Sequence, residues 1–321
     1  MSKNAKKWLI AAASLVTIGT ILFAAVMTAY HWDFSRLSTN QLETNTYGIS
    51  EEFSGIKLNT ETADILFAVS SDNTCRVVCI EEEKMKHSVS VQDGTLTVSA
   101  ADDRAWYEHI GFSFHSPKVT VYLPKAEYES LSITGSTGHI EIPNEIKFDR
   151  ADISLSTGDV KFFASVSGSI RIKTSTGDIR VKNTSAGTLD LSASTGEIVV
   201  SDVICKGDMN TSVTTGDVKA VNVMCQNLIS SGSTGNVSLK NVIAAEKFSI
   251  KRSTGDVVFD SSDAAGIFVK TSTGDVTGSL LSEKVFITET STGSVNVPQT
   301  ITGGKCEINT STGDIKIDIV D

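Results

Sequence analysis

Ser156-Thr157-Gly158-Asp159-Val160 recurs in near-copy ten times between residue 136 and the end of this 321-residue chain. The intervals between the repeated glycines are all 19 or 20 residues. A period held this narrowly is typical of a repeat architecture, in which each unit contacts only its neighbours. The repeated glycines are Gly138, Gly158, Gly177, Gly196, Gly216, Gly235, Gly255, Gly274, Gly293 and Gly313.

The residues two and four places after each glycine are nearly all apolar, as in Val160 and Phe162. Side chains two apart face the same side of a strand, so these form the inward face of a first strand. A second alternating run, such as Ile170 and Ile172, precedes the next glycine. Such faces are buried only if the coils stack. The pattern predicts an all-β fold, a single-stranded parallel β-helix (β-solenoid) with about ten coils of 19–20 residues, over residues 131–321.

The residue after the repeated glycine is usually acidic. Carboxylates stacked about 5 Å apart repel one another by roughly 1–3 kcal/mol, so a compensating group is required. We favour turn amides, because Asp and Asn readily bond the backbone two residues on. The alternative is a file of calcium ions, which prefer oxygen ligands. One carboxylate per coil, however, supplies few of the several oxygen ligands that each ion needs. The residues of this alternative metal file are Asp159, Asp178, Glu197, Asp217, Asp256 and Asp275.

The amino terminus contains 23 uncharged residues, Trp8 to Tyr30, after three lysines. A helix of this length reaches about 34 Å, enough to cross a bilayer core. The lysines favour a cytoplasmic amino terminus and an extracytoplasmic body. A cleaved signal peptide is the alternative, but its apolar region is normally shorter. We therefore predict a cytoplasmic stub and transmembrane helix at 1–32, in the cell membrane, followed by a stalk at 33–47.

Residues 48–130 contain several short alternating runs, which predict a β-rich capping segment. Asp93-Gly94 marks a hairpin, because the glycine tolerates the positive φ of a type I′ turn. Thr62-Ala63-Asp64-Ile65 matches the repeat except at the glycine, and we interpret it as a degenerate first coil. A solenoid end exposes an open edge, and atypical capping structure keeps it soluble.

The only aromatic-rich, non-repetitive stretch covers residues 104–115. Flat rings beside charged tips suit a partner-binding loop, and they equally suit a loop packed over the end of the solenoid. The residues of this candidate loop are Trp106, Tyr107, His109, Phe112 and Phe114.

Charge and cysteine content exclude several classes of function. After residue 30 the chain carries 25 basic and 38 acidic side chains, which disfavours nucleic acid as a partner. The five cysteines are too scattered for a disulfide framework or for zinc-ligand spacing. Cys205 and Cys225 each follow a repeat glycine by nine residues, so they are expected in neighbouring coils, either as two small buried thiols or as a disulfide.

The ten repeats, together with Ser116-Pro117-Lys118-Val119-Thr120-Val121-Tyr122-Leu123-Pro124, resemble a bacterial β-strand-repeat family of unknown function labelled "putative adhesin". The resemblance covers about Gly48 to Asp321. It implies the β-solenoid fold and carries no catalytic residues with it.

These features favour a non-catalytic, membrane-anchored extracytoplasmic solenoid that acts as an adhesin or cell-envelope interaction scaffold. Its expected partner is an envelope or surface component, either protein or polysaccharide, and no cofactor is expected. An alternative is a self-assembling scaffold or signalling partner that stacks through its carboxyl-terminal edge at 316–321. A β-helical polysaccharide-active enzyme is less favoured, because no repeat interval leaves room for a long active-site loop.

Overall fold

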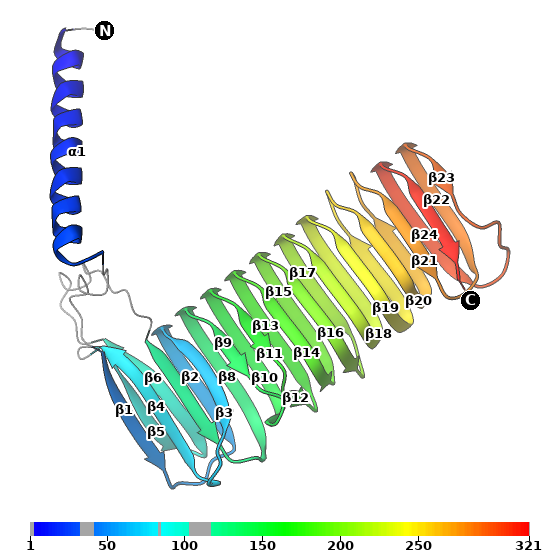
Figure 1. The fold of residues 1–321 in the computed structure, drawn as a ribbon. Coiled ribbons are helices and arrows are strands. Elements are labelled where there is room, and N and C mark those ends of the chain that lie inside the picture. Colours follow the sequence, from blue (N-terminus) through cyan, green and yellow to red (C-terminus); the bar gives the residue numbers. More distant parts are fainter. Residues whose placement is uncertain (1–2, 33–41, 83–84, 103–116, 321) are drawn as a thin grey trace.

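The computed structural model describes residues 3–32, 42–82, 85–102 and 117–320. Figure 1 shows a long stack of strands and one separate helix, α1 (Lys3–Ala29). The span Ala5–Ala29 of this helix is long and apolar enough to cross a membrane, and most of its residues are exposed. The apolar amino-terminal helix expected from the sequence is therefore present.

The strands that precede the repeats form one end of the stack. β2 pairs in parallel with β6 on one side and with β8 on the other, so the segment continues directly into the repeats. The strands of this end are β1 (Leu42–Ile49), β2 (Gly55–Thr62), β3 (Asp64–Val69), β4 (Cys75–Glu82), β5 (Met85–Gln92), β6 (Thr95–Asp102) and β7 (Lys118–Leu123).

Among the described strands, antiparallel pairing is confined to this end, which we call the cap. β4 runs antiparallel to β1 and β7, and β5 runs antiparallel to β6. The predicted Asp93-Gly94 hairpin connects β5 to β6, with φ of 49° and 70° at its two residues. One expectation was wrong: residues 42–47, assigned to the stalk, belong to β1, because their backbone pairs with β4.

The repeats form a parallel stack in which equivalent residues of successive coils lie side by side. Val160 pairs with Ile179, and Ile179 pairs with Ile198. The strands are β8 (Glu127–Thr137), β9 (Ile140–Ile142), β10 (Lys147–Thr157), β11 (Val160–Phe162), β12 (Ser165–Val166), β13 (Ser169–Thr176), β14 (Ile179–Ala186), β15 (Thr188–Thr195), β16 (Ile198–Cys205), β17 (Met209–Thr215), β18 (Val218–Thr234), β19 (Val237–Lys251), β20 (Val257–Lys270), β21 (Val276–Leu280), β22 (Lys284–Thr292), β23 (Val295–Asn296), β24 (Gly304–Thr312) and β25 (Ile315–Ile319).

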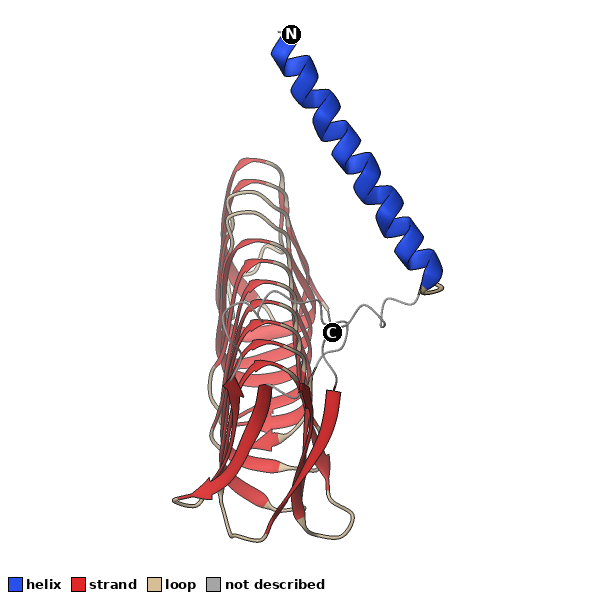
Figure 2. Ribbon diagram, turned by 90° about the vertical axis from the view of Figure 1, so that its left-hand side faces the viewer, coloured by secondary structure: helices blue, strands red, loops and turns tan. Residues whose placement is uncertain are grey.

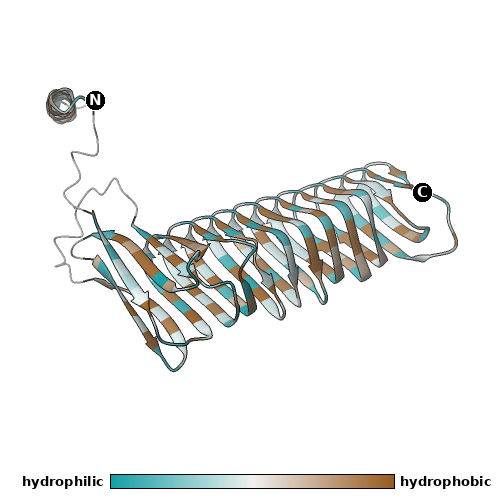
Figure 3. Cartoon of the chain, turned by 60° about the horizontal axis from the view of Figure 1, so that its bottom comes forward, coloured by the Kyte–Doolittle hydropathy of each residue, from teal (hydrophilic) through white to brown (hydrophobic). Residues whose placement is uncertain are grey.

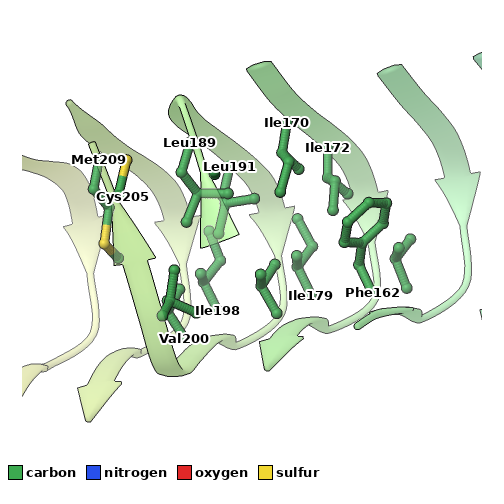
Figure 4. Close-up of a cluster of buried hydrophobic side chains, with 14 of the residues drawn as sticks. Phe162, Ile170, Ile172, Ile179, Leu189, Leu191, Ile198, Val200, Cys205 and Met209 are labelled. Carbon is green, nitrogen blue, oxygen red and sulfur yellow. The ribbon is translucent and has the colours of Figure 1, made fainter. Parts of the chain in front are cut away.

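One hydrophobic core runs through the cap and the repeats, from Ile56 to Ile317. Figure 4 shows its middle section, where Ile170 and Ile172 of one strand face Ile179 of the next. Hydrophobic and hydrophilic residues alternate along the strands in Figure 3. Burying each Val or Ile side chain contributes about 1.5–3 kcal/mol, so stability accumulates from coil to coil. The predicted β-solenoid is confirmed.

The last two coils are stacked out of sequence order. β24 pairs with β20 on one side and with β22 on the other, and β25 likewise lies between β21 and β23. The chain therefore passes the position of its own final coil, forms β22 and β23, and returns to fill the space (Figure 1). We call β22 and β23 the end coil. The expectation that residues 316–321 form an open edge holds only in part, because β25 pairs with β21 along its length but with β23 only at Ile315 and Lys316.

Candidate functional site

The glycine corner of each coil brings two backbones into direct contact. All ten repeat glycines have φ between 129° and 154°, where residues with a side chain are strained. A Cβ atom built on any of them would lie 1.8–2.1 Å from a carbonyl oxygen of the neighbouring coil. At Gly138 that oxygen belongs to Ala63, so the degenerate first coil predicted from Thr62-Ala63-Asp64-Ile65 is confirmed.

Most of the acidic residues that follow the repeat glycines bind the backbone of the neighbouring coil. Asp159 Oδ1 accepts the amide of Asp178 at 2.9 Å, and Asp178 Oδ1 accepts the amide of Glu197 at 2.8 Å. In four more pairs the side-chain Oδ1 of the first residue accepts the backbone amide of the second: Asp217 and Asn236, Asn236 and Asp256, Asp256 and Asp275, and Asp275 and Asp314. We call this file the acidic ladder. The carboxylates do accept amides, but from the next coil rather than from two residues on, because stacked coils place that amide closer.

Two further groups stabilise the ladder. The longer side chain of Glu197 binds Lys219 Nζ at 2.5 Å, and Arg180 binds Asp178 at 2.9 Å. At the far end, Asp314 accepts the amide of Ser294, and this backbone bond lowers the pKa of the Asp314 carboxyl. Neighbouring coils thus supply donors that offset the repulsion between carboxylates.

The calcium hypothesis for Asp159, Asp178, Glu197, Asp217, Asp256 and Asp275 stays a prediction. Within the described ranges, the only three His, Cys, Asp or Glu side chains whose ligand atoms lie within 4.8 Å of one another are Cys79, Glu81 and His87, in the cap. The ladder therefore offers no cluster of three such ligands in the described part of the chain.

Replacing Asp178 with Ala should lower the free energy of unfolding by about 1–3 kcal/mol, because the Glu197 amide loses its acceptor. Asp178→Asn keeps an oxygen at this position and should cost less than about 1 kcal/mol. Denaturant unfolding of the full chain in detergent measures both. Equal losses in the two variants would show that charge, rather than the acceptor, is what the ladder requires.

A second ladder lies at the next corner, six residues after the glycine. Asn183, Asp202, Asn222 and Asn241 all have φ between 50° and 56°, in the left-handed region that Asn and Asp tolerate. Asn222 Nδ2 donates to Asp202 Oδ1 at 2.8 Å, and Asn241 Nδ2 donates to Asn222 Oδ1 at 3.1 Å. This second ladder was not among the features predicted from the sequence. It could have been predicted, because its Asn and Asp residues repeat at the same interval as the glycines.

One long side of the rod presents a regular outward-facing surface. On the strands that precede the glycine corners, Ser192, Ser212 and Ser231 lie side by side in successive coils and are exposed or half-buried. Lys173 and Lys251 extend the file at its two ends. Figure 2 shows strands along the sides of the stack and loops at its corners. We call this surface, from residue 173 to residue 251, the serine-rich face.

The adjacent outward file combines charge and apolar residues. Arg171 lies 3.8 Å from Asp152 and 3.5 Å from Asp190, in the coils on either side. Exposed ion pairs of this kind contribute little to stability, so they leave the charges available to a partner. Towards the far end the same file contains Phe268, which is 38% exposed. Side chains on this side of the rod can therefore offer hydroxyl, charged and apolar contacts.

Cys205 and Cys225 show no sign of reactivity. All five cysteines are free and buried. Cys205 and Cys225 directly follow Ile204 and Met224, which are paired in register, so they lie in neighbouring coils as expected. Burial raises the pKa of the Cys205 thiol, and it raises that of Cys225 to about 12. Such thiols are inert near neutral pH.

The candidate partner-binding loop lies outside the described residues. Its members are Trp106, Tyr107, His109, Phe112 and Phe114. Its assignment stays a prediction.

Comparisons with known proteins identify one family. The family described as Toastrack DUF4097 matches residues 53–223 and 204–321. No curated protein matches the chain.

Several solved structures are similar to this chain. One titled "putative adhesin", from Parabacteroides distasonis ATCC 8503, is 13% identical, covers 85% of this chain and 98% of its own, and has a TM-score of 0.46. A second with the same description, from Bacteroides fragilis NCTC 9343, is 15% identical, covers 87% and 97%, and has a TM-score of 0.38. A third, titled "Putative lipid binding protein" and also from Parabacteroides distasonis ATCC 8503, is 12% identical, covers 86% and 97%, and has a TM-score of 0.42.

Proposed function

We propose, from the premise that this chain belongs to the Toastrack DUF4097 family, that it is a membrane-anchored rod outside the cytoplasm that acts as an adhesin or envelope interaction scaffold. The observation that carries the proposal is the in-register stacking of the strands that precede the glycine corners. It sets Ser192, Ser212 and Ser231 at a regular spacing of about 4.8 Å along one side. A partner that contacts several coils gains affinity from many weak contacts at once.

The amino-terminal helix supports the anchored location. Its apolar side chains are exposed, including Trp8 at 78% and Leu15 at 71%, which water would not favour. Lys6 and Lys7 directly precede the uncharged run that begins at Trp8, and basic residues remain on the cytoplasmic side of a membrane. The rod then extends on the other side.

A non-catalytic role agrees with the site geometry. Polysaccharide-active solenoids need an acid and a base, or a metal, converging in a cleft. In the described part of the chain, the carboxylates of the acidic ladder are instead spaced along the rod, each bound to a neighbouring coil. We therefore favour the scaffold hypothesis over the enzyme hypothesis.

The serine-rich face is tested by capture from envelope material. Full-length chain in nanodiscs would be incubated with cell-wall and surface fractions, and the bound protein and polysaccharide would be quantified. The double variant Ser212→Arg with Ser231→Arg should reduce capture about tenfold, because two long cationic side chains disrupt the flat surface.

The matched control carries Ser238→Arg with Thr277→Arg, on the strands that follow the glycine corners. This control should capture as much as the unmodified chain. Equal capture by all three proteins, or equal loss in both variants, would remove the serine-rich face from the proposal.

Self-assembly is the second candidate, and one observation favours it. In the described chain β22 has β24 as its only strand partner, and Val285 and Ile287 on it are 37% and 50% exposed. An open strand edge can pair with a second copy. Light scattering of the detergent-solubilised chain at rising concentration separates the two functions, since only self-assembly predicts growth in particle mass.

A further inference from the structure

A buried polar cluster lies in the cap, remote from the serine-rich face. Cys79 and Glu81 are two residues apart on β4, so both point inward, and His87 on β5 returns over them. All three are buried: Cys79 and Glu81 are fully inaccessible, and His87 is 3% exposed. Residues of these types are seldom buried together in an apolar core without a partner that compensates them.

Hydrogen bonds fix the position of the imidazole. Glu81 Oε2 lies 2.7 Å from His87 Nδ1 and also accepts the His87 backbone amide at 2.7 Å. Glu81 Oε1 accepts Asn45 Nδ2 at 2.7 Å. Glu81 Oε2 and His87 Nδ1 thus lie side by side, and a cation that replaces the proton between them can bind both atoms.

The cluster remains incompletely satisfied by the protein. His87 Nε2 is buried, and among the described residues it has no hydrogen-bond partner. An unpaired polar atom in a core costs about 1–3 kcal/mol. The contact with Glu81 therefore does not by itself satisfy the imidazole.

We propose that Cys79, Glu81 and His87 bind a divalent cation of the zinc class. Their ligand atoms already lie within 4.8 Å of one another. Ligands around tetrahedral zinc are about 3.6 Å apart, so small side-chain movements would close the site. The cation displaces the thiol proton and the proton that Glu81 and His87 share.

Charge and ligand softness decide the class of cation. One thiolate, one carboxylate and one neutral imidazole balance a charge of +2 inside an apolar core. Sulfur and imidazole favour zinc and related transition metals over calcium or magnesium, which prefer oxygen. The bound ion would fix the start of β5 against β4 and so stabilise the cap.

Metal content of the full-length chain in detergent tests the proposal. After incubation with Zn²⁺ alone and removal of the excess, about one ion should remain per chain, and Ca²⁺ should leave none at the cap. Co²⁺ alone should give a thiolate-to-cobalt absorption band, which reports sulfur ligation directly. His87→Gln and Cys79→Ser should each weaken Zn²⁺ binding by about tenfold or more.

Cys75→Ser is the matched control, because Cys75 is also a buried thiol on β4 but lies outside the cluster. It should bind Zn²⁺ as the unmodified chain does. If Cys79→Ser fails to fold, loss of the cobalt band in His87→Gln decides the question. Retention of less than about a tenth of an ion per chain, or an unchanged cobalt band in His87→Gln, would overturn the proposal and leave a buried Glu81–His87 pair. Neither outcome bears on envelope capture.

Discussion

Gly216→Ala is expected to lower the free energy of unfolding by about 3–5 kcal/mol, although it adds only one methyl group. Gly216 has φ of 141°, which strains any residue with a Cβ. The added Cβ would also lie 2.0 Å from the carbonyl oxygen and 2.7 Å from the carbonyl carbon of Gly196. Because backbone rather than a mobile side chain occupies this space, the coils must separate to relieve the overlap.

Denaturant unfolding of the full chain measures this loss, and hydrogen exchange locates it. We expect the fastest exchange in β17 and β18, on either side of the substitution. Gly48→Ala is the control, because Gly48 has an ordinary φ and no atom within 4 Å of its added Cβ. A loss below about 1 kcal/mol at Gly216 would mean that the coils are not held at this spacing.

Lys284→Met is expected to cost about 3–5 kcal/mol and to loosen the end coil. Lys284 Nζ lies 2.6 Å from Asp263 Oδ1, with side-chain exposures of 2% and 15%. Lys284 Nζ also donates to Ser282 Oγ. Removing the lysine leaves the Asp263 carboxylate largely buried without its cation.

A double-mutant cycle tests this explanation. Lys284→Met combined with Asp263→Asn should recover most of the loss, because no uncompensated charge remains. Lys240→Met is the control: its pair with Asp260 has a similar distance, 2.9 Å, but side-chain exposures of 56% and 48%. It should cost less than about 1 kcal/mol. If the double variant is as unstable as Lys284→Met, the lysine stabilises the end coil by packing rather than by charge.

Local repetition made most of the fold predictable. The glycine interval, the inward pairs such as Val160 and Phe162, and the degenerate coil at Ala63 are all set by short-range rules of strand alternation and turn conformation. The second ladder, formed by Asn183, Asp202, Asn222 and Asn241, obeys the same rules and could have been predicted from the spacing of Asn222 and Asn241.

The identity of hydrogen-bond partners could not be predicted in the same way. Asp178 has several amides within reach along its own turn, and only the stacking of coils brings the Glu197 amide to its Oδ1. Arg252 is a similar case: it is 5% exposed, and burial lowers its pKa to about 10. Its place in the repeat gives no indication of a buried charge.

The sequence by itself determined that this chain is a β-solenoid with an apolar amino-terminal helix, because period, alternation and apolar length are properties of neighbouring residues. Tertiary structure alone decided that β24 and β25 lie inside the stack, and that Cys79, Glu81 and His87 converge. The physical reason is that similar coils offer nearly equivalent edges to one another. Which edge a coil occupies therefore depends on contacts such as that between Lys284 and Asp263, 21 residues apart in sequence but 2.6 Å apart in space.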